Sequence, residues 1–286
     1  MDIDLGGKVA VVTGASRGAG RAIAAELGAA GATVYVTGRS MRGGGRTEDL
    51  PGTIDDAADE VTARGGRGIA VRVDHTVDAE ARALFARVAA EAGAPDLLVN
   101  NVWGGYEGYF DADFDAEFWR QPLERWERMY GAGVRAHFTA SALAAPLMAP
   151  RGRGLIVSTV AWAFGRYMGN VIYDSAKAAI IRMVLGMAHD LRPHGVAAMA
   201  VAPGFMRTER VLAAHAAAPF DLSGTESPVY LARAVVALAG DAAVLERSGR
   251  LLTAGELARE YGFTDQDGTR PEPFRLPGDA PVAAAA

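Results

Sequence analysis

A phenol and an ammonium group stand four positions apart in the segment VIYDSAKAAI, residues 171–180, as Tyr173 and Lys177. On an α-helix this offset places both side chains on one face, one turn apart. A phenol has a reference pKa of about 10 and does little acid–base work near pH 7 unless its anion is stabilised. An ammonium ~4 Å away, at an effective dielectric near 20, supplies on the order of 4 kcal/mol, or about three pKa units. The pair predicts proton transfer by Tyr173 with Lys177 lowering its pKa, although YxxxK spacing also arises by chance and other segments must decide.

The elements that position this pair can be read from the hydrophobic pattern. Short β-branched segments bounded by Gly, Pro or Asn alternate with longer helical patterns, which is typical of strands buried on both faces. Helix starts are indicated at Thr53, with Asp56 three residues on, and at residues 121–122. The sequence predicts an α/β fold with a single Rossmann-type doubly wound parallel sheet flanked by helices on both faces. The expected strands lie within residues 8–14, 32–38, 68–74, 96–100, 154–159 and 196–204, with a last one in GRLLTA, 249–254.

Composition limits the partners of the chain. Half of the 286 residues are hydrophobic, and no repeat or linker divides them, so we expect one domain over residues 1–277 and a flexible tail over 278–286. A net charge of -5 gives no basic field for nucleic acid or an anionic membrane surface, and no apolar stretch reaches the length of a membrane span. The absence of Cys excludes disulfides and thiolate chemistry and fits a cytoplasmic protein. The five His residues lack metal-ligand spacing, so we expect no metal site.

A glycine-rich turn, TGASRGAG, follows the first expected strand at residues 13–20 and runs into a helix. Glycines at this place allow a tight turn and the close approach of a pyrophosphate, which the helix amides and dipole then hold. Gly14, Gly18 and Gly20 are therefore the expected phosphate contacts. Glycine is abundant in this chain, so the position of the turn between strand and helix carries the argument.

The end of the second strand indicates which nucleotide binds. An acidic residue there would accept hydrogen bonds from a free ribose 2′-hydroxyl and repel a 2′-phosphate, but the residue is Arg39. Arg17, inside the glycine turn, can approach the same phosphate from the other side. The two arginines predict NADP(H) rather than NAD(H) as the cofactor.

Several motifs in this order resemble the short-chain dehydrogenase/reductase family over nearly the whole chain. The TGxxxGxG turn lies at residues 13–20, the NNxG element is NNVWG from Asn100, and the YxxxK pair is Tyr173 and Lys177. The segments 100–126 and 249–268 resemble more narrowly the branch containing dehydrogenase/reductase family member one. The resemblance implies that Asp74 contacts the adenine and Thr208 the nicotinamide carboxamide. The cofactor-binding residues expected from the motifs and the resemblance are Gly14, Ser16, Arg17, Gly18, Gly20, Arg39, Asp74, Asn100, Tyr173, Lys177, Pro203, Gly204 and Thr208.

Two positions depart from the family pattern. Relatives use a Ser about a dozen residues before the Tyr to hold the substrate oxygen, and that count reaches Val160 or Ala161 here. Ser158 or Thr159 can reach the place if the following loop is longer, and Ser158 has the freer rotamer; both hydroxyls can equally serve only to satisfy backbone groups. The relay Asn of the family, seven residues after a Trp, is replaced by Gly133, so we expect proton delivery to Lys177 to run through water.

Aromatic side chains follow the fourth and fifth strands, where α/β sheets bind ligands. They predict a bulky and largely apolar substrate, although about half of them should be ordinary packing residues. The expected substrate contacts are Trp103, Tyr109, Trp162 and Phe205.

The resemblance implies reversible hydride transfer between NADP(H) and a carbonyl or alcohol. Tyr173 would give the proton, Lys177 would lower its pKa and contact the nicotinamide ribose, and Ser158 or Thr159 would orient the substrate. Two alternatives remain: redox-neutral chemistry on the same scaffold, such as epimerisation or dehydration, and binding of NADP(H) without turnover by a sensor or scaffold protein. The presence of both Tyr173 and Lys177 argues against the second.

The helix that carries the catalytic pair also predicts self-association. Apolar side chains from residue 172 to residue 187 spread beyond the single stripe that one sheet would cover. We expect this helix, with the long helix from residue 123, to pack against its symmetry mate in a homodimer or homotetramer, as in many relatives. The alternative is that the segment 256–268 folds back over this surface within one chain.

Overall fold

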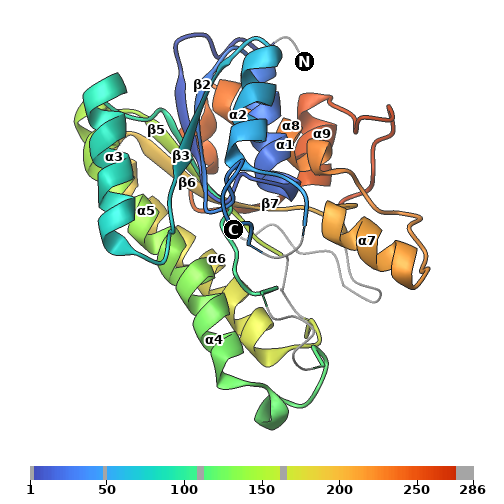
Figure 1. The fold of residues 1–286 in the computed structure, drawn as a ribbon. Coiled ribbons are helices and arrows are strands. Elements are labelled where there is room, and N and C mark those ends of the chain that lie inside the picture. Colours follow the sequence, from blue (N-terminus) through green and yellow to red (C-terminus); the bar gives the residue numbers. More distant parts are fainter. Residues whose placement is uncertain (1–2, 48–49, 108–112, 162–165, 275–286) are drawn as a thin grey trace.

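The computed structural model describes residues 3–47, 50–107, 113–161 and 166–274. Its centre is a seven-stranded, fully parallel sheet in the order β3-β2-β1-β4-β5-β6-β7 (Figure 1). The predicted α/β class and all seven predicted strands are confirmed. The strands are β1 (Val9–Val12), β2 (Thr33–Gly38), β3 (Arg67–Arg72), β4 (Leu97–Asn100), β5 (Gly154–Thr159), β6 (Val196–Ala202) and β7 (Leu251–Thr253).

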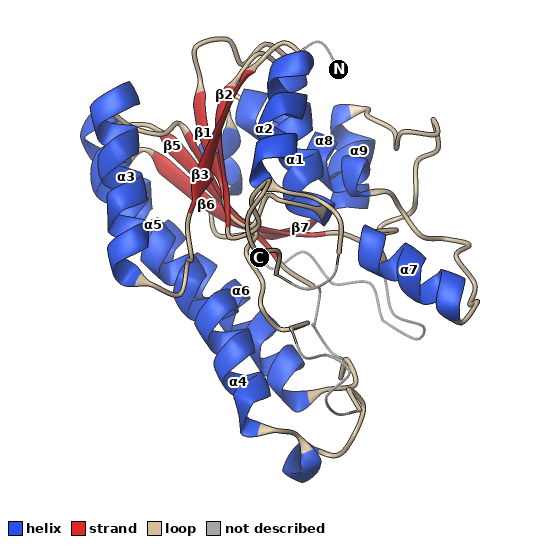
Figure 2. Cartoon of the chain, viewed as in Figure 1, coloured by secondary structure: helices blue, strands red, loops and turns tan. Residues whose placement is uncertain are grey.

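Helices cover both faces of the sheet (Figure 2). One face carries α1 (Gly18–Ala29), α2 (Ile54–Ala63), α8 (Pro228–Gly240) and α9 (Ala254–Tyr261), and the other carries α3 (Asp78–Ala92), α5 (Ala136–Met148) and α6 (Val171–Leu191). Helices α4 (Leu123–Met129) and α7 (Glu209–Ala217) extend beyond the carboxyl ends of the strands. Short helices span Phe118–Arg120, Ala149–Arg151, Arg192–His194 and Val244–Arg247, and a π-helical segment, Tyr130–Arg135, joins α4 to α5. No helix in the described part of the chain is long and apolar enough to cross a bilayer.

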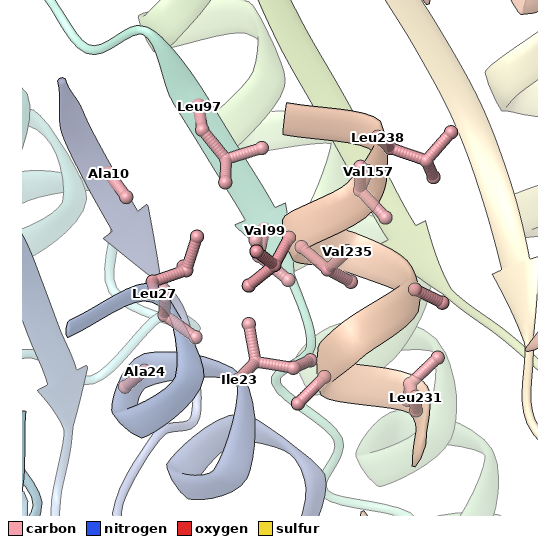
Figure 3. Close-up of a cluster of buried hydrophobic side chains, with 14 of the residues drawn as sticks. Ala10, Ile23, Ala24, Leu27, Leu97, Val99, Val157, Leu231, Val235 and Leu238 are labelled. Carbon is pink, nitrogen blue, oxygen red and sulfur yellow. The ribbon is translucent and has the colours of Figure 1, made fainter. Parts of the chain in front are cut away.

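Alternation along the buried strands divides the core into two layers. Leu97 and Val99 of β4 pack toward α1 and α8, where Figure 3 shows them in one cluster with Ile23 and Val235, whereas Leu98 packs toward α3 and α5. Burial of each such side chain stabilises the fold by about 1.5–3 kcal/mol. The two layers hold the strands in register, so the residues that follow each strand meet at one edge of the sheet.

Local signals set the helix boundaries. The Thr53 hydroxyl accepts a hydrogen bond from the Asp56 N–H (3.1 Å) and caps α2, as its spacing predicts. Pro122 precedes the first residue of α4, within one residue of the predicted start. The strand order reverses between β1 and β4, where α1, which follows β1, covers one face of the sheet and α5, which follows β4, covers the other. In doubly wound sheets this is where ligands bind.

Candidate active site

The turn after β1 is fastened to the loop after β4. The Thr13 hydroxyl accepts hydrogen bonds from the N–H groups of Asn101 (2.9 Å) and Val102 (3.1 Å). Gly14 has a φ of +65°, and a Cβ there would lie 2.7 Å from the Val102 Cα. Only glycine fits this close approach. The turn therefore holds the shape that the glycine motif predicts.

The amino end of α1 binds a carboxylate of the protein itself, that of Glu209. The Gly18 N–H donates to both carboxylate oxygens of Glu209, at 3.3 and 3.0 Å, and the cap residue Arg17 supplies no side-chain cap. An anion is stabilised here by the free N–H groups and the helix dipole. The Glu209 carboxylate stands where the phosphate oxygens of a dinucleotide would bind, so the residues at this turn fit such a cofactor. Sequence reasoning missed Glu209, because its contact with α1 spans 191 positions.

Both predicted phosphate-binding arginines lie around Ser40, just past the end of β2. The Arg17 guanidinium donates to the Ser40 hydroxyl (3.1 Å) and to the Pro51 carbonyl (3.2 Å). Arg39 pairs with the carboxylates of Glu107 and of Asp74, the latter at 3.9 Å. Burial acts to raise the pKa of Asp74, but hydrogen bonds from Thr76 and the charge of Arg39 leave it below its ordinary value. The structure thus brings Arg17, Arg39 and Asp74 to one end of the sheet. Ser16, the residue before Arg17 in the glycine turn, is buried.

Asn100 and Asn101 point to opposite faces. The Asn100 side chain is fully buried and donates to the hydroxyls of Ser141 on α5 (2.9 Å) and Ser158 on β5 (3.5 Å). The Asn101 side chain instead donates to the Gly14 carbonyl (3.0 Å). Asn101 therefore contacts the glycine turn, whereas the side chain of Asn100, the residue expected to hold the cofactor, contacts Ser141 and Ser158. The period-two alternation of a strand carries this signal, since Asn101 shares its parity with Leu97 and Val99.

Tyr173 and Lys177 lie on one face of α6, as predicted. The Asn170 side chain caps this helix and accepts a hydrogen bond from the Tyr173 N–H (3.0 Å). The Lys177 Nζ is 5.4 Å from the centroid of the Tyr173 ring and only 3.4 Å from that of Trp103. The ammonium is thus held on the face of an indole, a favourable cation–π arrangement.

The expected pKa relation between these two groups is wrong for this arrangement. Burial, followed by the charge and hydroxyl of Tyr106, raises the pKa of Tyr173 well above its ordinary value of 10. Burial also lowers the pKa of Lys177 to about 7. Desolvation is the largest cause of both shifts, and the rings of Trp103 and Tyr106 pack against Tyr173.

The Trp103 indole lies beside Gly133, the residue that replaces the relay Asn of the family. A Cβ at Gly133 would lie 2.5 Å from Cζ3 of Trp103, so the indole fills the space that a side chain would take there. Gly133 lies in the π-helical segment between α4 and α5. The glycine at this position is therefore required by Trp103.

His137, one turn after Gly133, is a buried residue to which the sequence assigned no role. Its Nε2 lies 3.1 Å from the Val102 carbonyl oxygen, which can only accept, so Nε2 carries the proton. Burial and the charge of Lys177 lower the pKa of His137 to about 3. The neutral His137 imidazole, through its hydrogen bond to the Val102 carbonyl, fixes the backbone immediately before Trp103.

Neither candidate substrate hydroxyl meets Tyr173. Ser158 is fully buried and takes the weak hydrogen bond from Asn100. The Thr159 hydroxyl donates to Asn101 Oδ1 (3.3 Å) and so belongs to the opposite face of β5. Among the described residues no hydrogen bond joins either hydroxyl to the phenol.

The loop after β6 closes the site. Thr208 caps α7 and lies beside Gly18, with its Cγ2 3.7 Å from where a Cβ of Gly18 would be. Glu226 lies under Gly204 in this loop, with Pro203 before it, and burial raises the pKa of Glu226 to about 7. Phe205 is exposed and its ring centroid is 6.1 Å from that of Phe220.

Some of the aromatic residues surround Tyr173 and form the wall of the candidate site, whereas others are exposed on the surface. Trp103, Tyr106 and Phe114 surround Tyr173, with ring centroids 5.6, 6.4 and 5.7 Å from it. Phe118 and Trp119 are exposed, so they are not part of this wall. The predicted substrate contacts Tyr109 and Trp162 lie outside the described residues. The described part of the chain contains no group of side chains arranged for a metal ion.

The chain is similar to known dehydrogenases along most of its length. A family model described as short chain dehydrogenase matches residues 8–217. Dehydrogenase/reductase SDR family member 1 of Mus musculus is 39% identical over 274 residues, 92% of this chain and 84% of the mouse protein. A short chain dehydrogenase from Mycobacterium thermoresistibile has a TM-score of 0.80 at 26% identity, covering 94% of this chain and 92% of its own. A 7α-hydroxysteroid dehydrogenase solved with NADH and 7-oxo glycochenodeoxycholic acid has a TM-score of 0.71 at 28% identity, covering 94% and 97%.

Proposed function

The chain belongs to the short-chain dehydrogenase/reductase family, and on that premise we propose that it transfers a hydride between NADP(H) and a carbonyl or alcohol of a bulky, largely apolar small molecule. Family membership establishes an oxidoreductase of alcohols or carbonyls that uses a nicotinamide cofactor. The observation that carries the proposal further is the pair of Tyr173 and Lys177 on one face of α6, with Lys177 buried and Tyr173 half-buried. The aromatic wall around Tyr173 supports an apolar substrate.

The chain's own residues account for binding and for the proton. Gly14, Gly18 and Gly20 would hold the pyrophosphate, with Thr208 at the carboxamide. When bound, the nicotinamide supplies or accepts the hydride. Because the raised pKa of Tyr173 keeps its proton in place at neutral pH, the phenol can donate that proton to a carbonyl oxygen. Lys177 on the next turn stabilises the phenolate that remains.

A panel of carbonyl compounds tests this function. Loss of NADPH absorbance with bulky ketones is expected for the wild type, and Tyr173→Phe should abolish turnover while NADPH affinity changes less than about twofold, because only the proton donor is lost. Tyr167→Phe, which removes an exposed phenol, is the matched control. A Tyr173→Phe enzyme with most of the wild-type rate would place the acid elsewhere. NADPH binding without oxidation by any compound would favour redox-neutral chemistry or a binding protein.

The choice of NADP(H) rests on Arg39 and Arg17. We expect NADPH to bind at least tenfold more tightly than NADH, about 1.4 kcal/mol. The 2′-phosphate would take the place of Glu107 at the Arg39 guanidinium. Calorimetry should show that Arg39→Ala weakens NADPH and leaves NADH unchanged. Arg42→Ala, an exposed arginine paired with Asp56, is the control, and equal affinities for the two nucleotides in the wild type would refute the preference.

A further inference from the structure

The place of the family's substrate-orienting serine is apolar in this chain. Val160 is 3% exposed and packs against Ile180 and Val184 of α6. Ala161 follows it, and the hydroxyls of Ser158 and Thr159 are engaged with Asn100 and Asn101. A second donor to the substrate oxygen therefore has to come from another element.

Tyr106, in the loop after β4, brings a hydroxyl to Tyr173. The two rings are stacked, with centroids 6.4 Å apart and planes 29° apart, and a side-chain hydrogen bond joins the two phenols. Trp103 makes edge-to-face contacts with both rings, and its centroid lies 6.3 Å from that of Tyr106 and 5.6 Å from that of Tyr173. Arg210 of α7 lies over the Tyr106 ring at 5.4 Å. These contacts hold the two hydroxyls so that they converge on one point.

We propose that Tyr106 is a second catalytic residue, whose hydroxyl donates a hydrogen bond to the substrate oxygen in place of the absent serine. This inference rests on the proposed function. A carbonyl oxygen that enters between the phenols replaces their mutual hydrogen bond with one from each. Donors aimed at an oxygen that gains charge lower the barrier more than they tighten ground-state binding.

The two phenols differ in what they do with their protons. Tyr173 is backed by Lys177 on the same face of α6, so its O–H bond breaks and a new O–H bond forms on the substrate oxygen. Tyr106 keeps its proton and only donates. Among the described residues, the charged and titratable groups that face the pair are Lys177 and Asp174 on α6 and Arg210 on α7.

Steady-state kinetics with NADPH and the best ketone of the panel test the role of the hydroxyl. Tyr106→Phe keeps the ring and removes the donor, so kcat/KM should fall between tenfold and a hundredfold with the NADPH Kd within twofold. Tyr130→Phe is the matched control. It removes a phenol hydroxyl that contacts Ser175 (3.0 Å) on α6, the helix that carries Tyr173. An undiminished kcat/KM in Tyr106→Phe, or a loss confined to NADPH affinity, overturns the proposal.

A suppressor variant separates the hydroxyl from the packing of the ring. Val160→Thr is nearly isosteric and puts a hydroxyl just after β5, near the usual place of the serine. Added to Tyr106→Phe, it should recover at least fivefold in kcat/KM. A double variant no better than Tyr106→Phe assigns the loss to packing and overturns the proposal.

The phenol pair can also be tested without cofactor or turnover. In protein labelled with ¹³C at tyrosine Cζ, Tyr106→Phe should shift the Tyr173 signal, and Tyr173→Phe should shift the Tyr106 signal, because each loses its partner. Unmoved signals overturn the proposal. Because this measurement uses the free protein, unmoved signals contradict only the role of Tyr106. A wild type that oxidises NADPH with none of the ketones in the panel contradicts the proposed function itself.

Discussion

At the scale of single residues, the Trp103 indole governs how the catalytic lysine is held. Its face carries the Lys177 ammonium, and its edge fills the space beside Gly133. His137 fixes the backbone carbonyl just before it. Gly133, Trp103 and Lys177 therefore act as one packing unit, and a change at one should alter the effect of a change at another.

A double-mutant cycle measures this coupling. Gly133→Ala should lower the free energy of unfolding by about 1–3 kcal/mol, because the new methyl would overlap the indole. In a Trp103→Ala background the same substitution should be nearly neutral. Gly131→Ala, in the same π-helical segment with open space around it, is the control. Urea unfolding gives all four values, and equal losses from Gly133→Ala in both backgrounds would contradict the coupling.

At the scale of elements, α7 is fastened to α1 through Glu209. The contact brings the loop after β6 over the glycine turn, at the site that a pyrophosphate would occupy. A bound cofactor would have to displace this carboxylate; α7 has no buried residues, and Figure 1 shows it standing apart from the helices that cover the sheet. Glu209 is then a competitor for the cofactor.

Removal of that competing charge should tighten cofactor binding. Glu209→Gln should lower the NADPH Kd about two- to fivefold, since a charge at a helix amino end contributes about 0.3–1 kcal/mol. Calorimetry checks the value. Asp221→Asn, which makes the same change in net charge beyond the end of α7, should leave the Kd unchanged. A Kd that rises in Glu209→Gln would mean that the carboxylate assists binding instead.

The predicted self-association depends on α4, α5 and α6. Ile172, Ala176, Ile180 and Val184, four of the side chains that suggested an interface, are buried within the chain instead. Other apolar groups on these helices remain exposed: Leu123, Trp126, Phe138, Val171 and Leu185. The described part of the late segment packs on α8, as the contact of Phe263 with Tyr230 shows (5.4 Å), so the alternative that it covers α6 is wrong.

We therefore predict a two-fold dimer through these exposed groups. Light scattering at micromolar concentration should give a dimer for the wild type and a monomer for Leu185→Asp, because a buried unpaired carboxylate opposes the contact. Leu212→Asp, on α7 with nearly the same exposure (46% against 45%), is the control and should stay dimeric. A monomeric wild type would refute the interface.

At the scale of the whole molecule, buried titratable groups set the response to acid. Burial lowers the pKa of His75 to about 4 and that of His137 to about 3, from an ordinary value of 6.5. The neutral histidines contribute their full stabilisation of the fold above pH 6.5. This contribution is lost as the pH falls toward the pKa values of the folded state, about 4 and about 3. Glu226 has the opposite sign: its raised pKa of about 7 stabilises the fold below pH 4.5, and this is lost as the pH rises through 7.

Between pH 5 and 6 the unfolded chain should bind about two more protons at His75 and His137 than the folded chain does, and about one fewer at Glu226. The net difference is about one proton, bound by the unfolded chain. The free energy of unfolding should thus fall by about 1.4 kcal/mol for each unit of pH lowered. Glu226→Gln removes the opposing group and should nearly double this slope. Urea titrations at pH 5.0, 5.5 and 6.0 measure both slopes; the same slope in the two proteins would contradict the assignment of Glu226.

Local sequence determined a large part of this protein. The strands, the glycine turn, the Thr53 cap and the shared face of Tyr173 and Lys177 depend on neighbours within a few positions, where periodicity, backbone freedom and capping act directly. The sheet order follows from the alternation of strands and helices, because parallel strands need crossovers. The position of each motif at the sheet's carboxyl edge was predictable for the same reason.

Only the tertiary structure decided what surrounds those motifs. Trp103 beside Gly133, Tyr106 on Tyr173, and Glu209 at the amino end of α1 join segments separated by 30, 67 and 191 positions. No local pattern encodes such contacts, because they arise when strands and helices distant in the chain pack together. The pKa values of Tyr173 and Lys177 depend on the same packing: spacing brings the charges near each other, but burial by residues from other elements sets the direction of each shift.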